Sequence, residues 1–366
     1  MTTTVNNEHK NIKVPNLRFK EFQGEWEMCK FKDVCSTSTG NKNTQDKIDD
    51  GIYPFYVRSQ TVERINSWTF DGEAILTAGD GVGVGKVFHH TYGKIGVHQR
   101  VYILSNFKCD ANYLFHFFSS HFYNRVKRMS AKNSVDSVRK EMITEMPLYL
   151  PSKQEQTKIG VLLSLLDERI STQNKIIEDL KKLKCAIAER LFNVTDGDSV
   201  PLTEVCTIQK GKQINGEFLS EKGKYYVMNG GTEPSGYYDK SNAPADTISI
   251  SEGGNSCGYI QYNREAFWSG GHCYTLNNIT PNVCKLYLYH YLKSQEGSIM
   301  KLRIGTGLPN IQKKDLEKFC ILLPSKAKQE SISTFLTAIE SKIANEEMLQ
   351  NYFQEEKLYL LRQMFI

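Results

Sequence analysis

Two segments of the chain carry apolar side chains at alternating intervals of four and three residues, which is the pattern of a helix that buries one stripe along its length. In the first segment, 159–191, the stripe consists of Ile159, Leu163, Leu166, Ile170, Gln173, Ile177, Leu180, Lys184, Ile187 and Leu191. All of these positions except Gln173 and Lys184 are apolar. A second stripe runs from Ile332 to Met364 and is interrupted at Glu346, Gln350 and Lys357. Neither helix can leave such a stripe in water. We therefore expect two long antiparallel coiled-coil helices that pack on each other and separate the remaining parts of the chain.

Short runs rich in aromatic and β-branched residues fill the rest of the chain and are separated by Gly, Asn and Asp, as is typical of strands joined by turns. In the first part these runs are 53–57, 74–77, 86–88 and 100–104, and in the second part 225–227, 247–250, 258–260 and 273–276. An aromatic helical segment follows each set, at 113–118 and 287–292. The same order in both parts predicts two homologous α+β domains, each β-rich with small helices.

An internal repeat supports two equivalent halves. Residues 150–192 align without a gap on 323–365, 173 positions later, with ten identities that include Gln156 on Gln329. This period is longer than the roughly 20–50 residues of solenoid repeats, so each unit is a full domain plus a helix. We expect a pseudo-two-fold molecule with its boundaries at 1–150 for the first domain, 151–194 for the central helix, 195–322 for the second domain and 323–366 for the last helix.

The composition is that of a globular chain, with 366 residues, 40% hydrophobic and 24% charged. The segment from Met1 to Lys13 is polar and no run of 18 apolar residues occurs, so we expect neither secretion nor a membrane span and place the chain in the cytoplasm. The nine cysteines include no Cys-x-x-Cys pair, which favours buried free thiols over a zinc site. No metal is predicted.

Positive charge is concentrated in residues 120–140, which contain a single acid, Asp136, and six basic residues: Arg125, Lys127, Arg128, Lys132, Arg139 and Lys140. Such a run is either an ordinary solvated face or a surface that follows DNA phosphates. The sequence alone leaves both interpretations open.

Motifs for catalysis are missing from the sequence. The Gly-rich stretch 78–87 lacks the Gly and the Ser or Thr that a phosphate-binding loop needs, and it also fails the dinucleotide pattern. The sequence lacks the Asn-Pro-Pro-Tyr or Asp-Pro-Pro-Tyr run of amino-group DNA methyltransferases. It also lacks the His-Glu-x-x-His motif of zinc proteases and the Gly-x-Ser-x-Gly turn that holds a nucleophilic serine. The histidines show no ligand spacing, and His116 and His290 occupy matching aromatic surroundings that indicate core or interface packing. We expect a chain that is not itself an enzyme.

The order of these features resembles the specificity subunit of type I DNA restriction–modification systems. The resemblance rests on two β-rich domains with divergent loops, each followed by a Pro-Ser-x-x-x-Gln-x-x-Ile helix at 151–159 and 324–332. The run 15–26 is similar to the opening of many such subunits, and 361–365 to their usual end. Each short motif is weak, whereas their order and duplication together are specific and cover nearly the whole chain.

The resemblance implies a bacterial or archaeal DNA-binding protein with two target recognition domains, each of which reads one half of a bipartite double-stranded DNA target. The paired helices would set the length of the unread spacer. It also implies two modification subunits that carry S-adenosylmethionine and two restriction subunits that use ATP and Mg, so no cofactor is expected in this chain.

Candidate DNA contacts follow from residue type, because Arg or Lys reads guanine and Asn or Gln reads adenine in the major groove. In the first domain these are Arg58, Gln60, Arg64, Lys86, Gln99 and Arg100, with Arg125, Lys127, Arg128, Lys132 and Arg139 on phosphates. In the second domain they are Lys212, Gln213, Asn229, Thr232, Tyr262, Asn263 and Arg264, with Lys301, Arg303 and Asn310 nearer the backbone. For any one of them the alternative is an ordinary solvated loop residue.

Apolar side chains outside the helical stripes suggest a second binding surface, because excess apolar area on an exposed rod is typical of a partner site. We expect modification subunits to dock on these residues: Leu162, Leu165, Ile176, Leu183, Leu349, Tyr352, Leu358 and Leu361.

Two other classes of function remain as alternatives. A stand-alone nuclease or methyltransferase with an unrecognised site would act on DNA without partners. A coiled-coil scaffold with two protein-binding domains would show no sequence-specific DNA retention and no steep salt dependence.

Overall fold

A computed structural model of the chain describes residues 13–130, 137–305, 307 and 309–366. The chain forms two compact units. Unit 1 comprises Met1–Gln173 together with Leu349–Ile366, and unit 2 comprises Asn174–Met348. Each unit therefore combines one β-rich domain with a part of both long helices.

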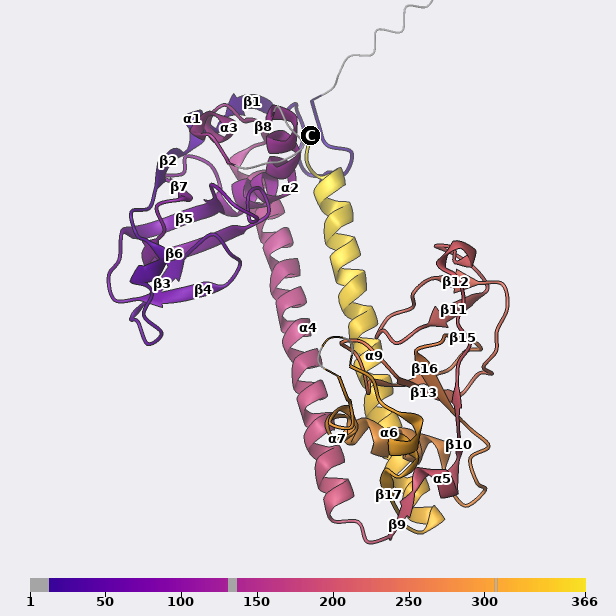
Figure 1. The fold of residues 1–366 in the computed structure, drawn as a ribbon. Helices are drawn as coiled ribbons and strands as arrows, with labels where there is room; N and C mark the ends of the chain where they lie inside the picture. Colours follow the sequence, from indigo (N-terminus) through magenta and orange to yellow (C-terminus); the bar gives the residue numbers. More distant parts are fainter. Residues whose placement is uncertain (1–12, 131–136, 306, 308) are drawn as a thin grey trace, which may run out of the picture. The chain divides into compact units, whose positions relative to one another are not determined.

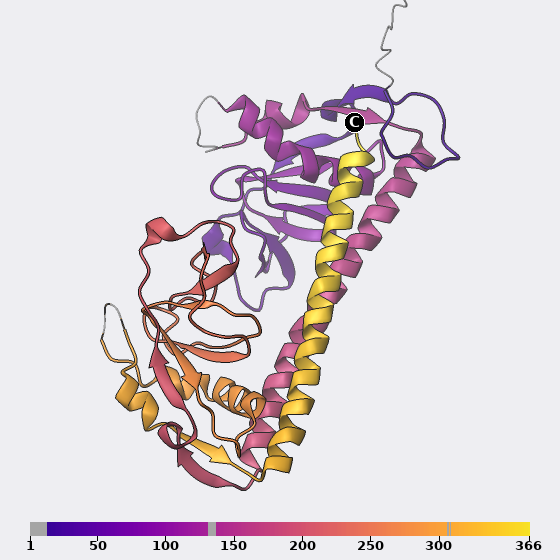
Figure 2. The ribbon, with the colours of Figure 1, turned by 90° about the vertical axis from the view of Figure 1, so that its right-hand side faces the viewer.

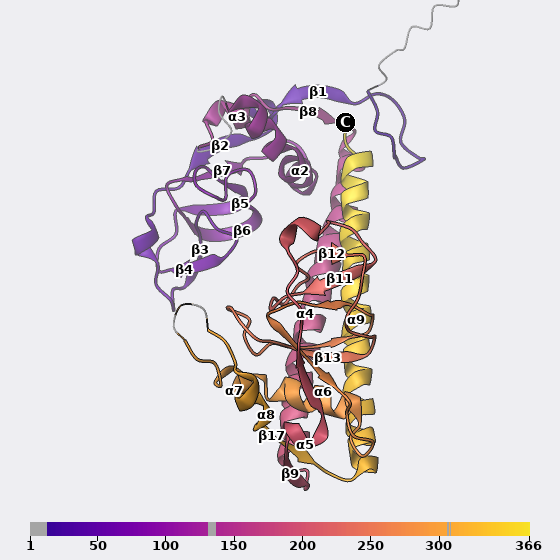
Figure 3. The same ribbon diagram turned by 45° about the vertical axis from the view of Figure 1, so that its right-hand side comes forward.

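The domain of unit 1 is built on a six-stranded sheet with the order β2-β7-β5-β6-β3-β4, which can be followed in Figures 1 and 3. Its longest strands, β5 (Phe70–Ala78) and β6 (Phe88–Val97), pair antiparallel, and the end of β6 pairs in parallel with β3 (Tyr53–Tyr56). The other strands of the sheet are β2 (Ser36–Thr39), β4 (Val62–Ile65) and β7 (Val101–Ser105). A separate antiparallel pair joins β1 (Glu27–Lys30) to β8 (Pro147–Leu150), and the short helices are α1 (Phe31–Val34), η1 (Thr44–Asp46) and α3 (Lys140–Thr144).

The aromatic helix α2 (Ala111–Met129) supplies the central aromatic side chains of the core of unit 1. Asp110 caps its first turn by accepting a hydrogen bond from the backbone N–H of Tyr113, which satisfies one of the unpaired donors of a helix start. Its phenylalanines meet the sheet and α1, with Phe118 lying 5.2 Å from both Phe31 and Phe88, ring centre to ring centre. The predicted helical segment at 113–118 is therefore confirmed as a core element.

Unit 2 repeats this plan with the sheet divided in two. One sheet has the order β10-β16-β13-β14 and the other β12-β11-β15. The division has a local cause: where unit 1 has the continuous strand β6, unit 2 has β14 (Ile260–Asn263) and β15 (Trp268–Ser269) with 264–267 between them. The other strands are β10 (Thr207–Lys210), β11 (Tyr225–Met228), β12 (Tyr237–Tyr238), β13 (Thr247–Ser251) and β16 (Cys273–Asn277), with a further pair β9 (Asp198–Pro201) and β17 (Cys320–Leu323). The helices are α5 (Leu202–Val205), η2 (Gly216–Phe218), α6 (Lys285–Ser294), α7 (Glu296–Met300) and α8 (Lys313–Glu317).

Strand register shows that the two domains are copies of one fold. Ala78 pairs with Val101 in unit 1, and Ser251 pairs with Cys273 at the matching place in unit 2. The turn that follows contains glycines with positive φ in both copies, Gly81 and Gly85 in unit 1 and Gly254 and Gly258 in unit 2. The isolated bridges Asp80–Ser137 and Gly253–Asn310 are likewise 173 positions apart at both ends. The predicted duplication is thus confirmed.

The long helices are α4 (Lys153–Asn193) and α9 (Lys326–Gln363). Every predicted stripe position on α4 is buried or half-buried, as are those on α9. In unit 1 Asp167 pairs with Lys357, while Ile159 and Leu163 share a core with Met364 and Phe365, so the two segments run antiparallel. In unit 2 Lys184 pairs with Glu340, and Ala188 and Phe192 share a core with Ile332 and Leu336 in the same antiparallel sense. The expected antiparallel coiled-coil packing is confirmed within each unit.

The repeated glutamine attaches each domain to its helix. Gln156 Oε1 accepts a hydrogen bond from the backbone N–H of Asp110 at 2.9 Å, and its Nε2 donates to the Pro151 carbonyl. Gln329 makes the equivalent bonds to the N–H of Cys284 and the carbonyl of Pro324. Both side chains are buried, which explains why the Pro-Ser-x-x-x-Gln pattern occurs twice.

A buried histidine makes the second attachment. The imidazole of His116 on α2 lies 3.1 Å from the Ser164 hydroxyl, and that of His290 on α6 lies 2.9 Å from the Thr337 hydroxyl. Figure 2 shows the orange α6 against the yellow α9 within unit 2. Burial lowers the pKa of His116 to about 3 and that of His290 to about 4, so both are neutral at pH 7. The predicted packing role of these two histidines is confirmed.

All nine cysteines are free thiols, as expected. The prediction that the cysteines are buried is wrong for Cys185 on α4 and Cys320 on β17, which are exposed. Burial raises the pKa of the Cys35 and Cys206 thiols to about 12, which makes them poor nucleophiles.

Candidate nucleic-acid interface

In unit 1, the charged side chains of Arg58, Asp80 and Arg100 meet where β5 ends. Asp80, two residues beyond Ala78, accepts a hydrogen bond from Arg58 Nη1 at 2.9 Å, and its other oxygen lies 3.7 Å from Arg100 Nε. Arg58 follows β3 and Arg100 precedes β7, so three separate segments bring these charges together. Arg58 and Arg100 are exposed, with side-chain exposures of 45% and 66%. The cluster therefore presents two guanidinium groups to solvent, of which Arg58 is held by a hydrogen bond to Asp80.

The Gly-rich turn beside this cluster is shaped by close backbone contacts. A Cβ on Gly83 would lie 2.3 Å from the Arg58 carbonyl oxygen, and one on Gly79 would lie 2.8 Å from that of Arg100. Gly81, at φ +74°, begins a tip on which Val82 is 99% exposed. The glycines thus let the turn pack against Arg58 and Arg100.

The other first-domain candidates are distributed over several surfaces. Gln60 is exposed near Arg58, and Gln99 donates from Nε2 to Asn43 Oδ1 at 2.6 Å. Arg64 instead braces the preceding loop by donating to the carbonyls of Gly51 and Ile52. Lys86 lies over the Tyr123 ring, 5.4 Å from its centre, and so belongs with helix α2.

The basic run on α2 contains one residue with a different role from the predicted one. Arg125 donates from Nε to the Met142 carbonyl at 2.7 Å and from Nη2 to the Glu145 carbonyl at 2.9 Å. It caps the end of α3, and burial lowers its pKa. We therefore correct its assignment from phosphate contact to structural bracing, because its donors already satisfy carbonyls. Arg128 and Arg139 are exposed and Lys127 lies over Tyr123, whereas Lys132 and Asp136 lie outside the described residues.

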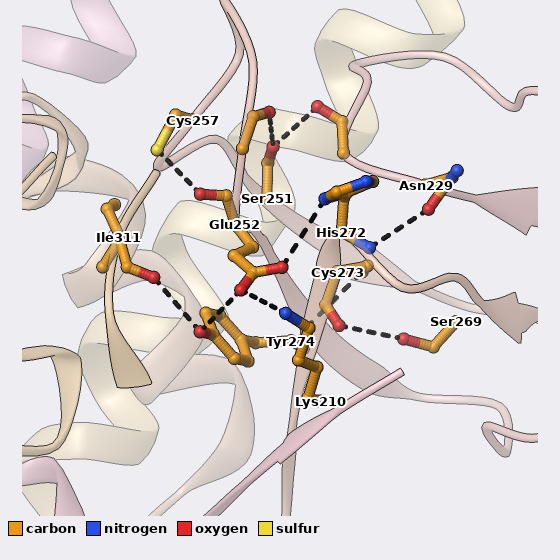
Figure 4. Close-up of polar contacts among 12 residues, drawn as sticks. Lys210, Asn229, Ser251, Glu252, Cys257, Ser269, His272, Cys273, Tyr274 and Ile311 are labelled. Carbon is orange, nitrogen blue, oxygen red and sulfur yellow. Dashed lines mark hydrogen bonds and ion pairs between the residues drawn. The ribbon is translucent and has the colours of Figure 1, made fainter. Parts of the chain in front are cut away.

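In unit 2 the corresponding place is a cavity of about 620 Å³, and Figure 4 shows polar contacts of four of its lining residues, Lys210, Asn229, Glu252 and His272. It is lined by Lys210, Asn229, Gly230, Gly231, Ser235, Glu252, Gly253, Gly254, His272, Pro309 and Asn310. Glycines form much of the wall, so backbone atoms are open to close approach by a ligand. Two of the predicted residues, Asn229 and Asn310, lie in this lining.

Glu252, directly after β13, is the central charge of this cavity. Its Oε1 accepts from Lys210 Nζ at 2.5 Å and lies 3.1 Å from the Tyr274 hydroxyl, and its side chain is only 11% exposed. Among the described residues Oε2 has no hydrogen-bond partner, and His272 Nδ1 is 3.7 Å away (Figure 4). Lys210 and His272 are more than half exposed. A nearly buried carboxylate thus lies between two outward-facing basic side chains.

The remaining second-domain candidates are mostly exposed. Asn229, in the cavity lining, accepts from the backbone N–H of His272 through Oδ1 at 3.1 Å, and this fixes its amide. Lys212, Gln213 and Thr232 are exposed on loops, and Lys301 and Arg303 are exposed beyond α7.

Three second-domain candidates lie away from the cavity around Glu252. Asn263 is 1% exposed, donates to the Thr247 carbonyl and the Ser249 hydroxyl, and accepts from the Tyr226 hydroxyl, so its polar atoms are used internally. Tyr262 and Arg264 line a different cavity, of about 550 Å³, with residues of α6 and α9. The Asn263 assignment is corrected, and the other two do not lie with the cavity around Glu252.

The apolar residues proposed for partner binding also divide into two sets. Leu165, Ile176, Leu183, Tyr352 and Leu358 are exposed on the helices. Leu162 and Leu361 instead pack against the core of unit 1, and Leu349 is half-buried. Leu162 and Leu361 are therefore corrected to core-supporting positions, because their surface is already covered within the unit.

Sequence reasoning missed Lys210, Asp80, Glu252 and His272. Acids are not obvious DNA contacts, and Lys210 lies in a strand. The available signal was the repeated Gly-rich turn, which has an acid at its start in both copies, Asp80 in one and Glu252 in the other.

Neither a candidate metal site nor a membrane-spanning helix is found in the described part of the chain. No group of three or more His, Cys, Asp or Glu side chains there is arranged to hold a metal ion. No helix there combines the length and apolar character needed to cross a membrane.

Comparison with known proteins identifies sequence relatives for parts of the chain. A putative type I specificity subunit of Mycoplasma genitalium is 36% identical over 140 residues, which are 38% of this chain and 36% of that protein. The type I restriction enzyme EcoDI specificity subunit of Escherichia coli is 27% identical over 173 residues, 46% of this chain and 38% of that protein. The chain thus aligns with little more than a third of the length of these relatives.

Solved structures agree over nearly the whole fold. The crystal structure of a type I restriction–modification S subunit from M. genitalium superposes with a TM-score of 0.74 at 19% identity, covering 96% of this chain and 99% of that one. A structure from work on complex assembly and conformational transition of the type I R-M system has a TM-score of 0.56 at 16% identity, covering 94% of this chain and 97% of that one. At these identities the likeness concerns the fold.

The model of the type I restriction modification DNA specificity domain matches residues 23–182 and again residues 196–352, so one match falls on each half of the repeat. The chain therefore belongs to the type I restriction modification DNA specificity family and contains two of its domains.

Proposed function

We propose that this chain is the DNA specificity subunit of a type I restriction–modification complex and that each of its two domains reads one half of a split target. The observation that carries the proposal is the pair of equivalent charged sites on one duplicated fold. Both sites lie after the matching strand, β5 or β13, yet they differ in composition, with Arg58 and Arg100 in one and Lys210 and His272 in the other. One fold that carries different basic side chains at each site is what two domains with different half-sites would need.

Contacts with the DNA backbone would come from the exposed basic residues around each site. In unit 1 these are Lys127, Arg128 and Arg139, and in unit 2 Lys301 and Arg303. Such contacts release counterions, so binding would weaken steeply with salt whatever the sequence. A protein-binding scaffold would lack this salt dependence.

The partners in this proposal are two modification subunits, which carry S-adenosylmethionine, and two restriction subunits, which use ATP and Mg. The exposed residues Leu165, Ile176, Leu183, Tyr352 and Leu358 on α4 and α9 support docking of modification subunits on the helices. The helices would also set the spacer between the half-sites. If Leu183→Glu with Leu358→Glu left co-purification of the modification subunit intact, docking on this surface would be refuted.

The chain itself is proposed to be non-catalytic. The purified chain, incubated with DNA and S-adenosylmethionine or with DNA and Mg²⁺, should neither methylate nor cut. Adding the modification subunit should give methylation at a split sequence. Methylation or cleavage by the chain alone would favour the alternative, a stand-alone methyltransferase or nuclease.

A further inference from the structure

The carboxylates of Asp80 and Glu252 lie in the corresponding Gly-rich turns of the two domains, one position apart. Asp80 lies two residues after Ala78 and Glu252 one residue after Ser251, and Ala78 and Ser251 are equivalent by strand register. The partner Arg100 lies one residue before Val101, and His272 one residue before Cys273, which is again the same place. One basic partner is thus retained in position, whereas the acid is shifted by one residue along the turn.

Each acid holds its basic partners without covering them. Asp80 bonds to Arg58 Nη1 and lies near Arg100 Nε, which leaves the outer N–H groups of both guanidiniums facing solvent. Lys210 directs one of its three N–H bonds to Glu252 and remains more than half exposed. Such held side chains lose less conformational freedom on binding than free ones do.

Glu252 is held more rigidly than a surface salt bridge requires. Its Oε1 meets both Lys210 and the Tyr274 hydroxyl, and its backbone bonds to Ile311 and to His272. The remaining oxygen, Oε2, is buried and unbonded among the described residues, and His272 Nδ1 lies 3.7 Å away. A small rotation of the imidazole would let Nδ1–H donate to this oxygen and would hold the ring in place beside Lys210.

We propose that Asp80 and Glu252 are positioning residues that aim basic side chains, Arg58 and Arg100 in one domain and Lys210 in the other, at guanine edges in the major groove. The inference rests on the proposed function and deepens it by assigning the base-reading groups. Guanine is the base chosen, since its O6 and N7 are acceptors side by side and match N–H donors. Phosphate contacts would need charge but not this fixed geometry.

The test uses the full chain in complex with its modification subunit and maps methylated sites on a randomised DNA library. Asp80→Asn and Glu252→Gln keep side-chain size but weaken the hold on the basic groups. Asp71→Asn, an exposed acid at the other end of β5, and Glu265→Gln, an exposed acid after β14, remove the same charge elsewhere and serve as matched controls. Thermal unfolding of each variant establishes that it is folded.

Asp80→Asn should reduce discrimination at a G·C position of one half-site by about tenfold to a hundredfold and leave the other half unchanged. Glu252→Gln should do the same in the other half, and both controls should keep the parent motif. The proposal would be overturned by an unchanged motif in folded variants. It would equally be overturned by a uniform loss of methylation with a shallower salt dependence, which marks phosphate contacts, or by a half-site made only of A·T pairs. Absence of any split motif with the parent chain would instead refute the proposed function.

Discussion

Acid should destabilise each unit through its buried histidine. His116 and His290 are almost fully buried, and desolvation, the largest cause, lowers their pKa values to about 3 and about 4 from 6.5. Lys357 also lowers the pKa of His116, whereas Glu340 raises that of His290 and Lys184 lowers it. At a pH between 6.5 and these lowered values, the histidine is protonated in the unfolded chain and neutral in the folded chain. The free energy of unfolding is therefore fully retained above about pH 6.5 and decreases as the pH falls below it.

The size of the effect follows from linkage. Lowering the pH from 7.5 to 5 should cost about 2 kcal/mol for each histidine, because the unfolded imidazole is then protonated and the folded one is still neutral. His116→Asn and His290→Asn keep a polar side chain near Ser164 and Thr337 but remove the titrating group. Both variants should be less stable than the parent at pH 7.5, and their stability should depend less on pH.

Guanidinium unfolding followed by circular dichroism at pH 7.5 and 5 measures this difference. Comparing each variant with the parent at the same two pH values cancels the contribution of carboxylates. We expect the parent to lose about 2 kcal/mol more than either single variant over this interval. An equal loss in parent and variants would refute the assignment of these histidines as buried neutral groups.

Three further sets of substitutions test the packing. Leu163→Ala, in the core of unit 1, should lower the free energy of unfolding by about 2–5 kcal/mol, whereas Leu165→Ala on the exposed face should change it by less than about 0.5 kcal/mol, as judged by denaturant unfolding. Gln156→Ala and Gln329→Ala should each cost about 1–3 kcal/mol, because each leaves a backbone N–H and C=O without their partner, and an equal melting temperature in parent and variant would contradict this. Asn263→Ala should lower the melting temperature while the methylated motif of the folded complex stays the same, and a changed motif would return Asn263 to the DNA contacts.

Periodicity predicted the long helices well because a coiled-coil stripe is a local property of the sequence. The ten stripe positions between Ile159 and Leu191 on α4 are buried or half-buried, as their spacing indicated. The repeat likewise predicted two copies of one domain, and it placed the histidines of α2 and α6 in matching surroundings. These features depend on residue type and spacing alone.

The candidate site could be predicted only in part, since residue type does not reveal what a side chain already contacts. Arg125 and Asn263 have the right chemistry for DNA, but their donors are taken by internal carbonyls and hydroxyls. Asp80 and Glu252 were passed over as acids, and their importance appears only when the strands bring Arg58 or Lys210 beside them. Which loops meet at the end of a sheet is a tertiary property.

The most direct test of the account is a genome-wide map of methylated bases in the host with the gene intact and with the gene deleted. The account predicts that deletion removes one split motif, methylated in both halves around a fixed gap. An unchanged map in cells that express the chain and its modification subunit would contradict it.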